Sequence, residues 1–203
     1  MDRQQWDERY SGAGFEWSMH PNQFAAAELA GLPPGRALDL AAGEGRNSVW
    51  LAERGWSVTA VDFSGVGLAK GRRLSAARGL PDGQVDWVIA DLSEYEPARA
   101  AYELVLIAYL QVDAALRARV LARAAAALVP GGTLLVIGHD LANLTEGVGG
   151  PQSPDVLYTS EAITAGLPGL RIVRAERVRR TVERDGGQAT AVDTLVRAER
   201  PAG

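Results

Sequence analysis

The residues with the clearest chemical meaning are two glycines in the first quarter of the chain, Gly43 and Gly45. They stand one residue apart, directly after the short apolar run "ALDLAA", and a helical pattern follows them. Glycine lets a ligand approach bare backbone, and the free N–H groups at the start of a helix favour an anionic group. The pattern therefore predicts a loop that binds either the pyrophosphate of a dinucleotide or the carboxylate of a nucleotide that bears an amino acid.

Two acidic residues extend this predicted site. Asp62 closes the run "SVTAVD", where its carboxylate could accept hydrogen bonds from both ribose hydroxyls of either cofactor type. Asp91 follows "VDWVIA", where it could bind an adenine amino group with Leu92 against the ring. The dinucleotide fingerprint requires Gly or Ala where Ser48 stands, which disfavours NAD. Structural interpretations stay open: a tight turn at the glycines, a helix N-cap at Asp62 and the cap of a short turn at Asp91.

Two histidines are the candidate proton-transfer groups, because only their unperturbed pKa suits such transfer near neutral pH. His139 directly follows the fifth predicted strand and so lies on the ligand side of the sheet, where Asp140 could orient it. His20 lies in "FEWSMHPNQF" and would reach an acceptor if that segment folds over the cofactor. Both could instead be solvated loop residues. No metal cluster is expected, since the nearby aspartates are scattered in sequence.

Alternating strand-like and helix-like segments must position these groups. Short apolar runs without a period of two predict strands buried on both faces. The clearest helix is predicted from Asp113 to Leu128, with Asp113 as its N-cap and Pro130-Gly131-Gly132 ending it and turning the chain. This alternation predicts an α/β protein with a parallel sheet. The predicted strands are Ala37–Leu40, Val58–Val61, Val85–Ala90, Leu104–Ile107 and Thr133–Ile137.

The two ends of the chain differ from this middle part. The runs "LRIVRAERVRRTV" and "TAVDTLVRAE" flank the turn signal Asp185-Gly186-Gly187, which predicts an antiparallel hairpin. Its arginines, mixed with glutamates, are typical of a solvated edge strand rather than of an RNA track. We expect one domain over residues 1–203: an arm or lid (1–35), a cofactor-binding core (36–140), and a rim loop, helix and hairpin (141–203).

Composition sets the outer limits. The chain has 203 residues, no cysteine and a formal net charge of −4, which together exclude disulfides and thiolate sites and disfavour general affinity for nucleic acid or anionic membrane. No apolar run approaches the ~20 residues that span a bilayer, and the polar N-terminus is not that of a signal peptide. We therefore expect a cytoplasmic protein, either a monomer or a homodimer.

Several motifs in order resemble those of class I S-adenosylmethionine-dependent methyltransferases. They are "LDLAAGEGRNSVWLAERGWSVTAVDFS", "ADL", "YELVLIAYLQ" and "LVPGGTLLV", which together with "WDERY" near the start are similar to the tellurite-resistance and thiopurine methyltransferase subgroup. The resemblance implies a Rossmann-like three-layer sandwich, with a seven-stranded, mostly parallel sheet and an antiparallel C-terminal hairpin. It covers about residues 6 to 140 and implies S-adenosyl-L-methionine as the cofactor.

The resemblance also implies a role for individual residues. The methionine end of the cofactor would contact Asp39, Ala41, Gly43 and the loop through Gly45. Asp62 would hold the ribose, Phe63 would lie beside the adenine, and Asp91 and Leu92 would frame that ring. Ala108 and Tyr109 would flank the sulfonium. The family's usual small residue and glycine before Gly43 are here Ala41 and Ala42. Their methyl groups restrict the conformations that the backbone of this loop can adopt.

The expected reaction is in-line displacement of a methyl group onto a small-molecule O, S or N acceptor, because no domain for recognising RNA or protein is apparent. A base, His139 or His20, is needed only if the acceptor arrives protonated. The alternatives are a non-catalytic cofactor-binding protein and, less favoured, a tRNA methyltransferase or an NAD-binding oxidoreductase.

Overall fold

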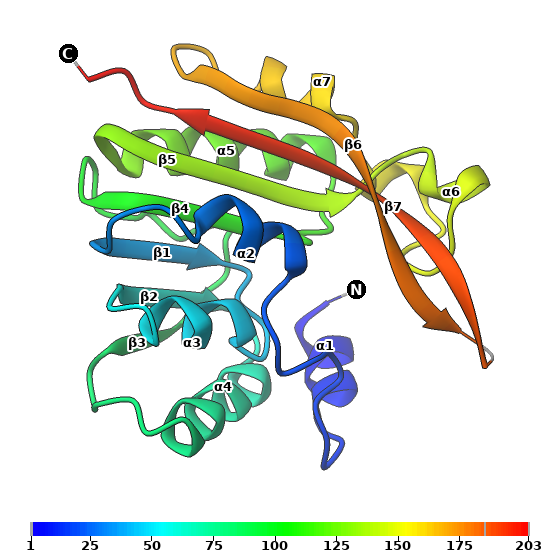
Figure 1. Ribbon diagram of the computed structural model, residues 1–203, viewed down its shortest axis with the longest axis horizontal. Coiled ribbons are helices and arrows are strands. Elements are labelled where there is room, and N and C mark those ends of the chain that lie inside the picture. The colour runs from blue at the N-terminus through cyan, green and yellow to red at the C-terminus, as the bar shows by residue number, and fades with distance from the viewer. Residues whose placement is uncertain (1, 185, 203) are drawn as a thin grey trace.

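Seven strands form one sheet in the order β3-β2-β1-β4-β5-β7-β6 in the computed structural model, which describes residues 2–184 and 186–202 (Figure 1). Strands β1 to β5 pair in parallel, whereas β7 is antiparallel to both β5 and β6. The mostly parallel sheet with an antiparallel C-terminal hairpin is therefore confirmed. The strands are β1 (Arg36–Leu40), β2 (Ser57–Asp62), β3 (Val85–Ile89), β4 (Tyr102–Ala108), β5 (Leu128–His139), β6 (Arg171–Arg184) and β7 (Gly187–Glu199).

Helices cover both faces of this sheet (Figure 1). Helices α2 and α3 lie on one face with α4 beside α3, while α5 and α7 lie on the other. Within the described residues, no helix is both long and apolar enough to cross a bilayer. The helices are α1 (Arg3–Tyr10), α2 (Gln23–Leu29), α3 (Arg46–Ala52), α4 (Gly65–Ala77), α5 (Ala114–Ala127), α6 (Asn143–Glu146) and α7 (Ser160–Ala165), with a 3₁₀ turn at Pro154–Val156.

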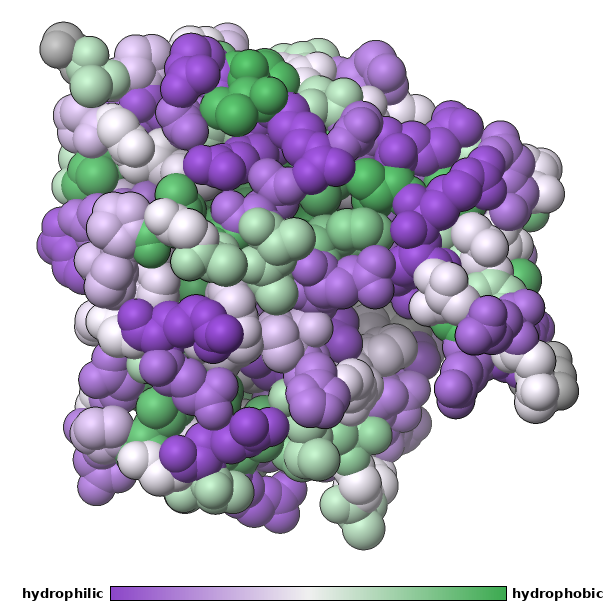
Figure 2. Space-filling model, in the orientation of Figure 1, coloured by the Kyte–Doolittle hydropathy of each residue, from purple (hydrophilic) through white to green (hydrophobic). Residues whose placement is uncertain are grey.

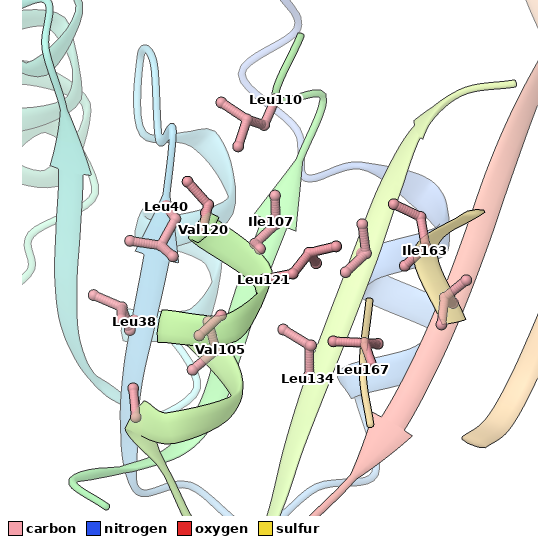
Figure 3. Close-up of a cluster of buried hydrophobic side chains, with 14 of the residues drawn as sticks. Leu38, Leu40, Val105, Ile107, Leu110, Val120, Leu121, Leu134, Ile163 and Leu167 are labelled. Atoms are coloured by element: carbon pink, nitrogen blue, oxygen red, sulfur yellow. The ribbon is translucent and has the colours of Figure 1, made fainter. Parts of the chain in front are cut away.

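The central strands are apolar on both faces because each face carries its own buried cluster. In β4, Leu104 and Leu106 pack on the α2 and α3 side, whereas Val105 and Ile107 pack on the α5 side. Figure 3 shows the second cluster, in which Leu121 of α5 lies against the sheet. Burial on both faces explains why these strands show no simple alternation of polar and apolar residues.

Helix α5 begins where the sequence predicts. The Asp113 carboxylate accepts a hydrogen bond from the Leu116 N–H at 2.9 Å, which makes Asp113 the N-cap. The prediction that Pro130-Gly131-Gly132 ends this helix was wrong. The helix ends at Ala127, β5 starts at Leu128, and the Gly131 N–H donates to the Arg200 carbonyl. The Pro-Gly-Gly motif therefore lies inside an irregular start of β5, where pairing with the C-terminal segment replaces a free turn.

The C-terminal hairpin extends past the rest of the sheet (Figure 1). The last pair between β5 and β7 joins His139 to Asp193, whereas β6 and β7 go on pairing to Arg184 and Gly187. Asp185, part of the predicted turn, lies outside the described residues. Hydrophilic side chains cover much of the outer strand β6 (Figure 2), and its exposed arginines pair largely with glutamates, as a solvated edge requires.

Candidate functional site

The glycine loop that follows β1 has an unusual backbone. Ala41, Gly43 and Gly45 all have positive φ, at 61°, 56° and 74°. A Cβ atom on Gly45 would lie 2.5 Å from the Trp87 ring, and one on Gly71 of α4 would lie 2.4 Å from it. Because no side chain fits there, the loop, α4 and Trp87 can pack only with glycine at both positions. The glycines predicted that a ligand would lie against bare backbone at this loop. Part of that close contact is made instead by the Trp87 ring of the protein itself.

Tyr10 of the N-terminal helix lies over the same loop. Its hydroxyl would be 2.9 Å from a Cβ on Gly43, and its ring 3.0 Å from a Cβ on Gly67 at the start of α4. Tyr10 is buried, and that burial raises the pKa of its hydroxyl, with the charge of Asp62 as the second cause. The arm therefore packs directly on the loop that is expected to face the methionine end of the cofactor.

Asp39 is a buried carboxylate with one free oxygen. Its side chain is 1% exposed, and Oδ2 accepts a hydrogen bond from the Ser48 hydroxyl at 2.6 Å. Oδ1 has no hydrogen-bond partner within the part of the chain that the structure describes. Burial raises the pKa of Asp39 to about 7, although the Ser48 hydrogen bond opposes the shift. An unpaired buried carboxylate oxygen is a position at which a ligand cation would gain a strong interaction.

Asp62 holds two segments of backbone together. Its Oδ2 accepts from the Gly43 N–H and its Oδ1 from the Ser64 N–H, both at 2.8 Å. The N-cap of α4 is Ser64. The alternative interpretation of Asp62 as a helix N-cap is therefore wrong. Burial raises the pKa of Asp62 against these two hydrogen bonds. Each carboxylate oxygen keeps a second lone pair, which leaves acceptor capacity for a diol.

The residues expected at the adenine follow β2 and β3. The Asp91 side chain is exposed and accepts a hydrogen bond from the Ser93 N–H at 2.8 Å, which lowers the pKa of Asp91. Leu92 is buried and Phe63 is half-buried. The Phe63 carbonyl accepts from Nε of Arg3 in α1 at 2.7 Å. Asp91 therefore caps the turn after β3, and its outward-facing carboxylate remains open to a ligand.

Tyr109 follows the end of β4 in a strained conformation. Its φ is 60°, a region that residues other than glycine seldom adopt, whereas the preceding Ala108 completes the strand. The Tyr109 hydroxyl donates to Asp193 Oδ2 at 2.8 Å and accepts from Asn22 Nδ2 at 3.2 Å. These two bonds tie the end of β4 to the hairpin and to the arm, and they hold the strained residue in place.

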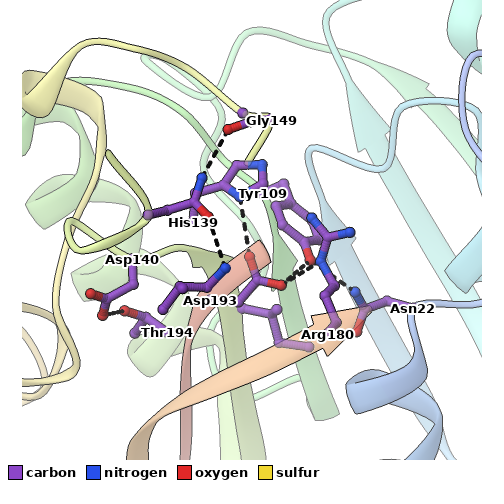
Figure 4. A network of polar contacts seen from close by, with 12 residues as sticks. Asn22, Tyr109, His139, Asp140, Gly149, Arg180, Asp193 and Thr194 are labelled. Atoms are coloured by element: carbon purple, nitrogen blue, oxygen red, sulfur yellow. Dashed lines mark hydrogen bonds and ion pairs between the residues drawn. The ribbon is translucent and has the colours of Figure 1, made fainter. Parts of the chain in front are cut away.

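His139 and Asp193 form the centre of a polar cluster at the carboxyl edge of the sheet (Figure 4). His139 Nδ1 lies 3.1 Å from Asp193 Oδ1, and the His139 and Tyr109 ring centroids are 4.9 Å apart. Arg180 Nε donates to Asp193 Oδ2 at 2.6 Å. Burial alone would raise the pKa of Asp193, but the contact with His139 and the charge of Arg180 together lower it. Asp193 is thus held as an anion facing His139.

Asp140 does not orient His139. Its carboxylate accepts from the Thr194 hydroxyl at 2.7 Å and lies 3.2 Å from Arg177 Nε, on the other side of β7. The partner of His139 comes instead from β7, because the register places Asp193 directly opposite His139. His139 is covered by the rim loop, where a Cβ on Gly150 would lie 2.7 Å from its ring.

His20 lies in the loop between α1 and α2. Its side chain is exposed, and its backbone N–H donates to the Ser18 hydroxyl at 3.0 Å. Two residues further on, the Asn22 N–H donates to Asn47 Oδ1 at 2.9 Å, so this loop crosses between α3 and Tyr109. The structure brings His139 into the cluster with Tyr109 and leaves His20 on the surface.

A buried ion pair attaches the arm to the glycine loop. Lys70 Nζ lies 2.9 Å from Glu44 Oε1, and both side chains are almost fully buried. Glu44 also accepts the N–H groups of Glu16 and Trp17, each at 3.0 Å, and Lys70 donates to the Gly14 carbonyl. One carboxylate and one ammonium therefore bind the Gly14–Trp17 segment to the core.

Comparison with known proteins places this geometry in a family. Residues 37–132 match the family model for a methyltransferase domain. No curated protein sequence matches the chain. Among solved structures, one from work on the conversion of a disulfide bond into a thioacetal group during echinomycin biosynthesis aligns with a TM-score of 0.77 at 20% identity, covering 99% of this chain and 93% of that one.

Two further structures share the fold. The N-methyltransferase NodS from Bradyrhizobium japonicum, in complex with S-adenosyl-l-homocysteine, aligns with a TM-score of 0.72 at 15% identity over 98% of both chains. TehB from Haemophilus influenzae aligns with a TM-score of 0.72 at 12% identity, over 98% of this chain and 66% of that one. At these identities the structural likeness establishes the fold and leaves the acceptor undefined.

Residues 37–132 are a methyltransferase domain by this match, and the fold around them is that of class I S-adenosylmethionine-dependent methyltransferases. TehB is among the structures of similar fold, as the "WDERY" motif and the motif around "GEGRN" led us to expect. The residues fit the cofactor. The free, buried Oδ1 of Asp39 can accept a hydrogen bond from the methionine ammonium, and Asp62 has acceptor capacity for the ribose.

Sequence reasoning missed the residues that lie far from the glycine loop in the chain. Asp193 and Arg180 come from the hairpin, and Tyr10 and Asn22 come from the arm. The only signal for Asp193 was an acidic residue inside an apolar strand, "TAVDTLVRAE". A buried acid in a strand is costly unless it is paired, so that position indicated a partner without naming it.

Proposed function

We propose that this methyltransferase transfers the methyl group by in-line displacement to a small-molecule O, S or N acceptor whose reactive atom lies beside His139. The observation that carries the proposal is the buried pair of His139 and Asp193, which stands next to Tyr109 at the carboxyl edge of the sheet. Ligands of open α/β sheets bind at this edge.

The contact with Asp193 supports a defined role for His139. The anionic Asp193 carboxylate lies 3.1 Å from Nδ1 without hydrogen-bond geometry, and its charge would favour a proton on that nitrogen, which would leave Nε2 to accept a proton. A hydroxyl or ammonium acceptor would lose its proton to Nε2, and the imidazolium formed would be stabilised by Asp193. A thiolate acceptor would not need this step.

The cofactor supplies a methyl group already activated on a positively charged sulfur. Asp39 would hold the methionine ammonium and Asp62 the ribose, while Ala108 and Tyr109 would line the region of the sulfonium. The protein's main contribution is therefore to orient the acceptor and to exclude water from it.

The surface supports a small acceptor over a nucleic acid. The exposed arginines of β6 are largely neutralised by glutamates, including Glu28, Glu146 and Glu199, and the chain is acidic overall. A track for RNA needs unpaired cations in a row.

The test is a screen of small acceptors for release of S-adenosylhomocysteine, repeated with His139→Ala and Asp193→Asn. With a hydroxyl or amine acceptor, we expect His139→Ala to lower kcat by about a hundredfold or more. Asp193→Asn should lower kcat less and change its pH profile. Calorimetry with S-adenosylhomocysteine checks that both variants still bind cofactor. Unchanged turnover of a hydroxyl acceptor by His139→Ala would refute the role of His139.

A further inference from the structure

Arg180 stands apart from the other arginines of the hairpin. Several of them pair with glutamates, namely Arg171 with Glu199, Arg174 with Glu28 and Arg179 with Glu146. Arg180 lies on the face of β6 that it shares with Asp193 and Val178, opposite to Arg177 and Arg179, because cross-strand partners share a face and alternate residues repeat it. Its guanidinium carbon lies 5.7 Å from the centre of the Tyr109 ring. This arginine is therefore directed to the carboxyl edge of the sheet, beside the expected acceptor position.

The Asp193 carboxylate is already shared among several donors. It accepts from the Tyr109 hydroxyl and from Arg180 Nε, and it contacts His139 Nδ1. The bond to Asp193 uses only Nε of Arg180. The two terminal nitrogens of the guanidinium keep the forked geometry that binds a carboxylate through two parallel hydrogen bonds.

A second arginine makes this region more positive. Arg46, at the start of α3, is half-buried and has no hydrogen-bond or ion-pair partner within the described residues. Its electrostatic neighbours are Tyr109, Arg180, Asp39 and Glu44. Glu44 is occupied by Lys70, and Asp39 would face the methionine ammonium. Burial and the nearby charge of Arg180 both lower the pKa of Arg46, so the two guanidiniums repel each other and an anion between them would be stabilised.

We propose that Arg180 binds a carboxylate of the methyl acceptor, so that the natural acceptor is a small carboxylic acid. This inference rests on the proposed function and narrows its substrate class. The carboxylate would lie on the terminal nitrogens of Arg180 and place the reactive atom of the acceptor toward His139. The methionine carboxylate of the cofactor has the same chemistry, and the experiment distinguishes these two sources.

The experiment measures binding to the full chain by calorimetry. Acetate and benzoate, each beside its neutral amide, are titrated into protein saturated with S-adenosylhomocysteine. The variants are Arg180→Gln and Arg180→Lys, with Arg179→Gln as the matched control, because Arg179 lies on the opposite face of β6 and pairs with Glu146. S-adenosylhomocysteine and 5′-methylthioadenosine, which lacks the amino-acid part, are also titrated into each variant.

We expect a carboxylate to bind at least about tenfold more tightly than its amide, and Arg180→Gln to abolish that preference. Arg180→Lys should keep part of it, and Arg179→Gln should keep all of it. Equal binding of acid and amide, or a preference that survives in Arg180→Gln, would overturn the inference. So would a loss of affinity for S-adenosylhomocysteine but not for 5′-methylthioadenosine in Arg180→Gln, since that places the carboxylate on the cofactor. If the wild-type chain failed to bind S-adenosylhomocysteine at all, the proposed function itself would fall.

Discussion

At the scale of single residues, Asp39 is the group whose chemistry depends most on burial. Its folded pKa of about 7 lies above the ordinary value of 3.8, so the folded state binds this proton more tightly than the unfolded chain does. Protonated Asp39 therefore makes its full contribution to the free energy of unfolding at acidic pH. That contribution is lost as the pH rises from about 4 to about 7.

Asp39→Asn should remove this pH dependence. A shift of this size corresponds to at most about 4 kcal/mol. We expect the variant to gain stability relative to wild type at about pH 8, and to gain little or nothing at about pH 4. Urea unfolding of both proteins at the two pH values measures the difference. Asp82→Asn, at an exposed acid in the turn before β3, serves as the control. Parallel stability curves for Asp39→Asn and wild type would show that Asp39 is ionised without penalty.

A substitution at Ala41 tests whether the backbone of the glycine loop is strained. An L-residue at a φ of 61° costs about 1 kcal/mol, and glycine relieves most of that cost. Ala41→Gly should therefore be neutral or stabilising by up to about 1 kcal/mol, because the greater freedom of glycine in the unfolded chain offsets part of the gain. Ala42→Gly, without positive φ, should destabilise instead. Thermal unfolding of the two variants decides this, and equal losses would argue against strain at Ala41.

At the scale of elements, the glycine loop and α4 depend on each other through Trp87. Gly71→Ala would bring a methyl group within 2.5 Å of the Trp87 ring and 3.2 Å of the Glu44 carbonyl. We expect a loss of about 1–3 kcal/mol, against the gain of about 1 kcal/mol that alanine normally brings to a helix. Combining the change with Trp87→Leu should recover part of the loss in urea unfolding. A stabilised Gly71→Ala protein would mean that α4 can move away from the loop.

The rim loop offers a matched pair of glycines. Gly149 and Gly150 both have a φ of 71°, but a Cβ on Gly149 meets nothing within 4 Å, whereas one on Gly150 meets His139. Both alanine variants should lose about 1 kcal/mol of stability from backbone strain, and Gly150→Ala should lose more because its methyl group overlaps the His139 ring. Only Gly150→Ala should also lower kcat, because it displaces the His139 ring. Equal kcat values for the two variants in the acceptor assay would separate the rim loop from His139.

At the scale of the whole molecule, the Gly14–Trp17 segment of the N-terminal arm is attached to the core by polar groups. Breaking the buried pair with Lys70→Met would leave the Glu44 charge unpaired, at a cost of about 3–5 kcal/mol. We expect faster cleavage of the Gly12–His20 segment in limited proteolysis, before the core unfolds. Arg9→Gln, which removes an exposed pair with Glu16, should change stability by less than about 1 kcal/mol. Identical cleavage rates for Lys70→Met and wild type would show that other contacts hold the arm.

The sequence was sufficient to predict the sheet and most of the cofactor loop, because both are local patterns. Apolar runs, the glycine pair and the Asp113 cap each act within a few residues. The acceptor side could not be predicted in the same way. The contact between His139 and Asp193 depends on the pairing of β5 with an antiparallel strand more than fifty residues later in the chain, and the register that makes it is a property of the assembled sheet. For the same reason, the sequence predicted the adjacent Asp140 as the partner of His139, whereas the partner is Asp193 on the neighbouring strand.

Lys70 has one further consequence. It is the only lysine in the chain, and its ammonium is enclosed between Glu44 and the Gly14 carbonyl. Reagents that acylate amines can therefore modify a single side chain of this protein, and only while the arm is lifted from it. The rate of that acylation would follow opening of the arm without any engineered label.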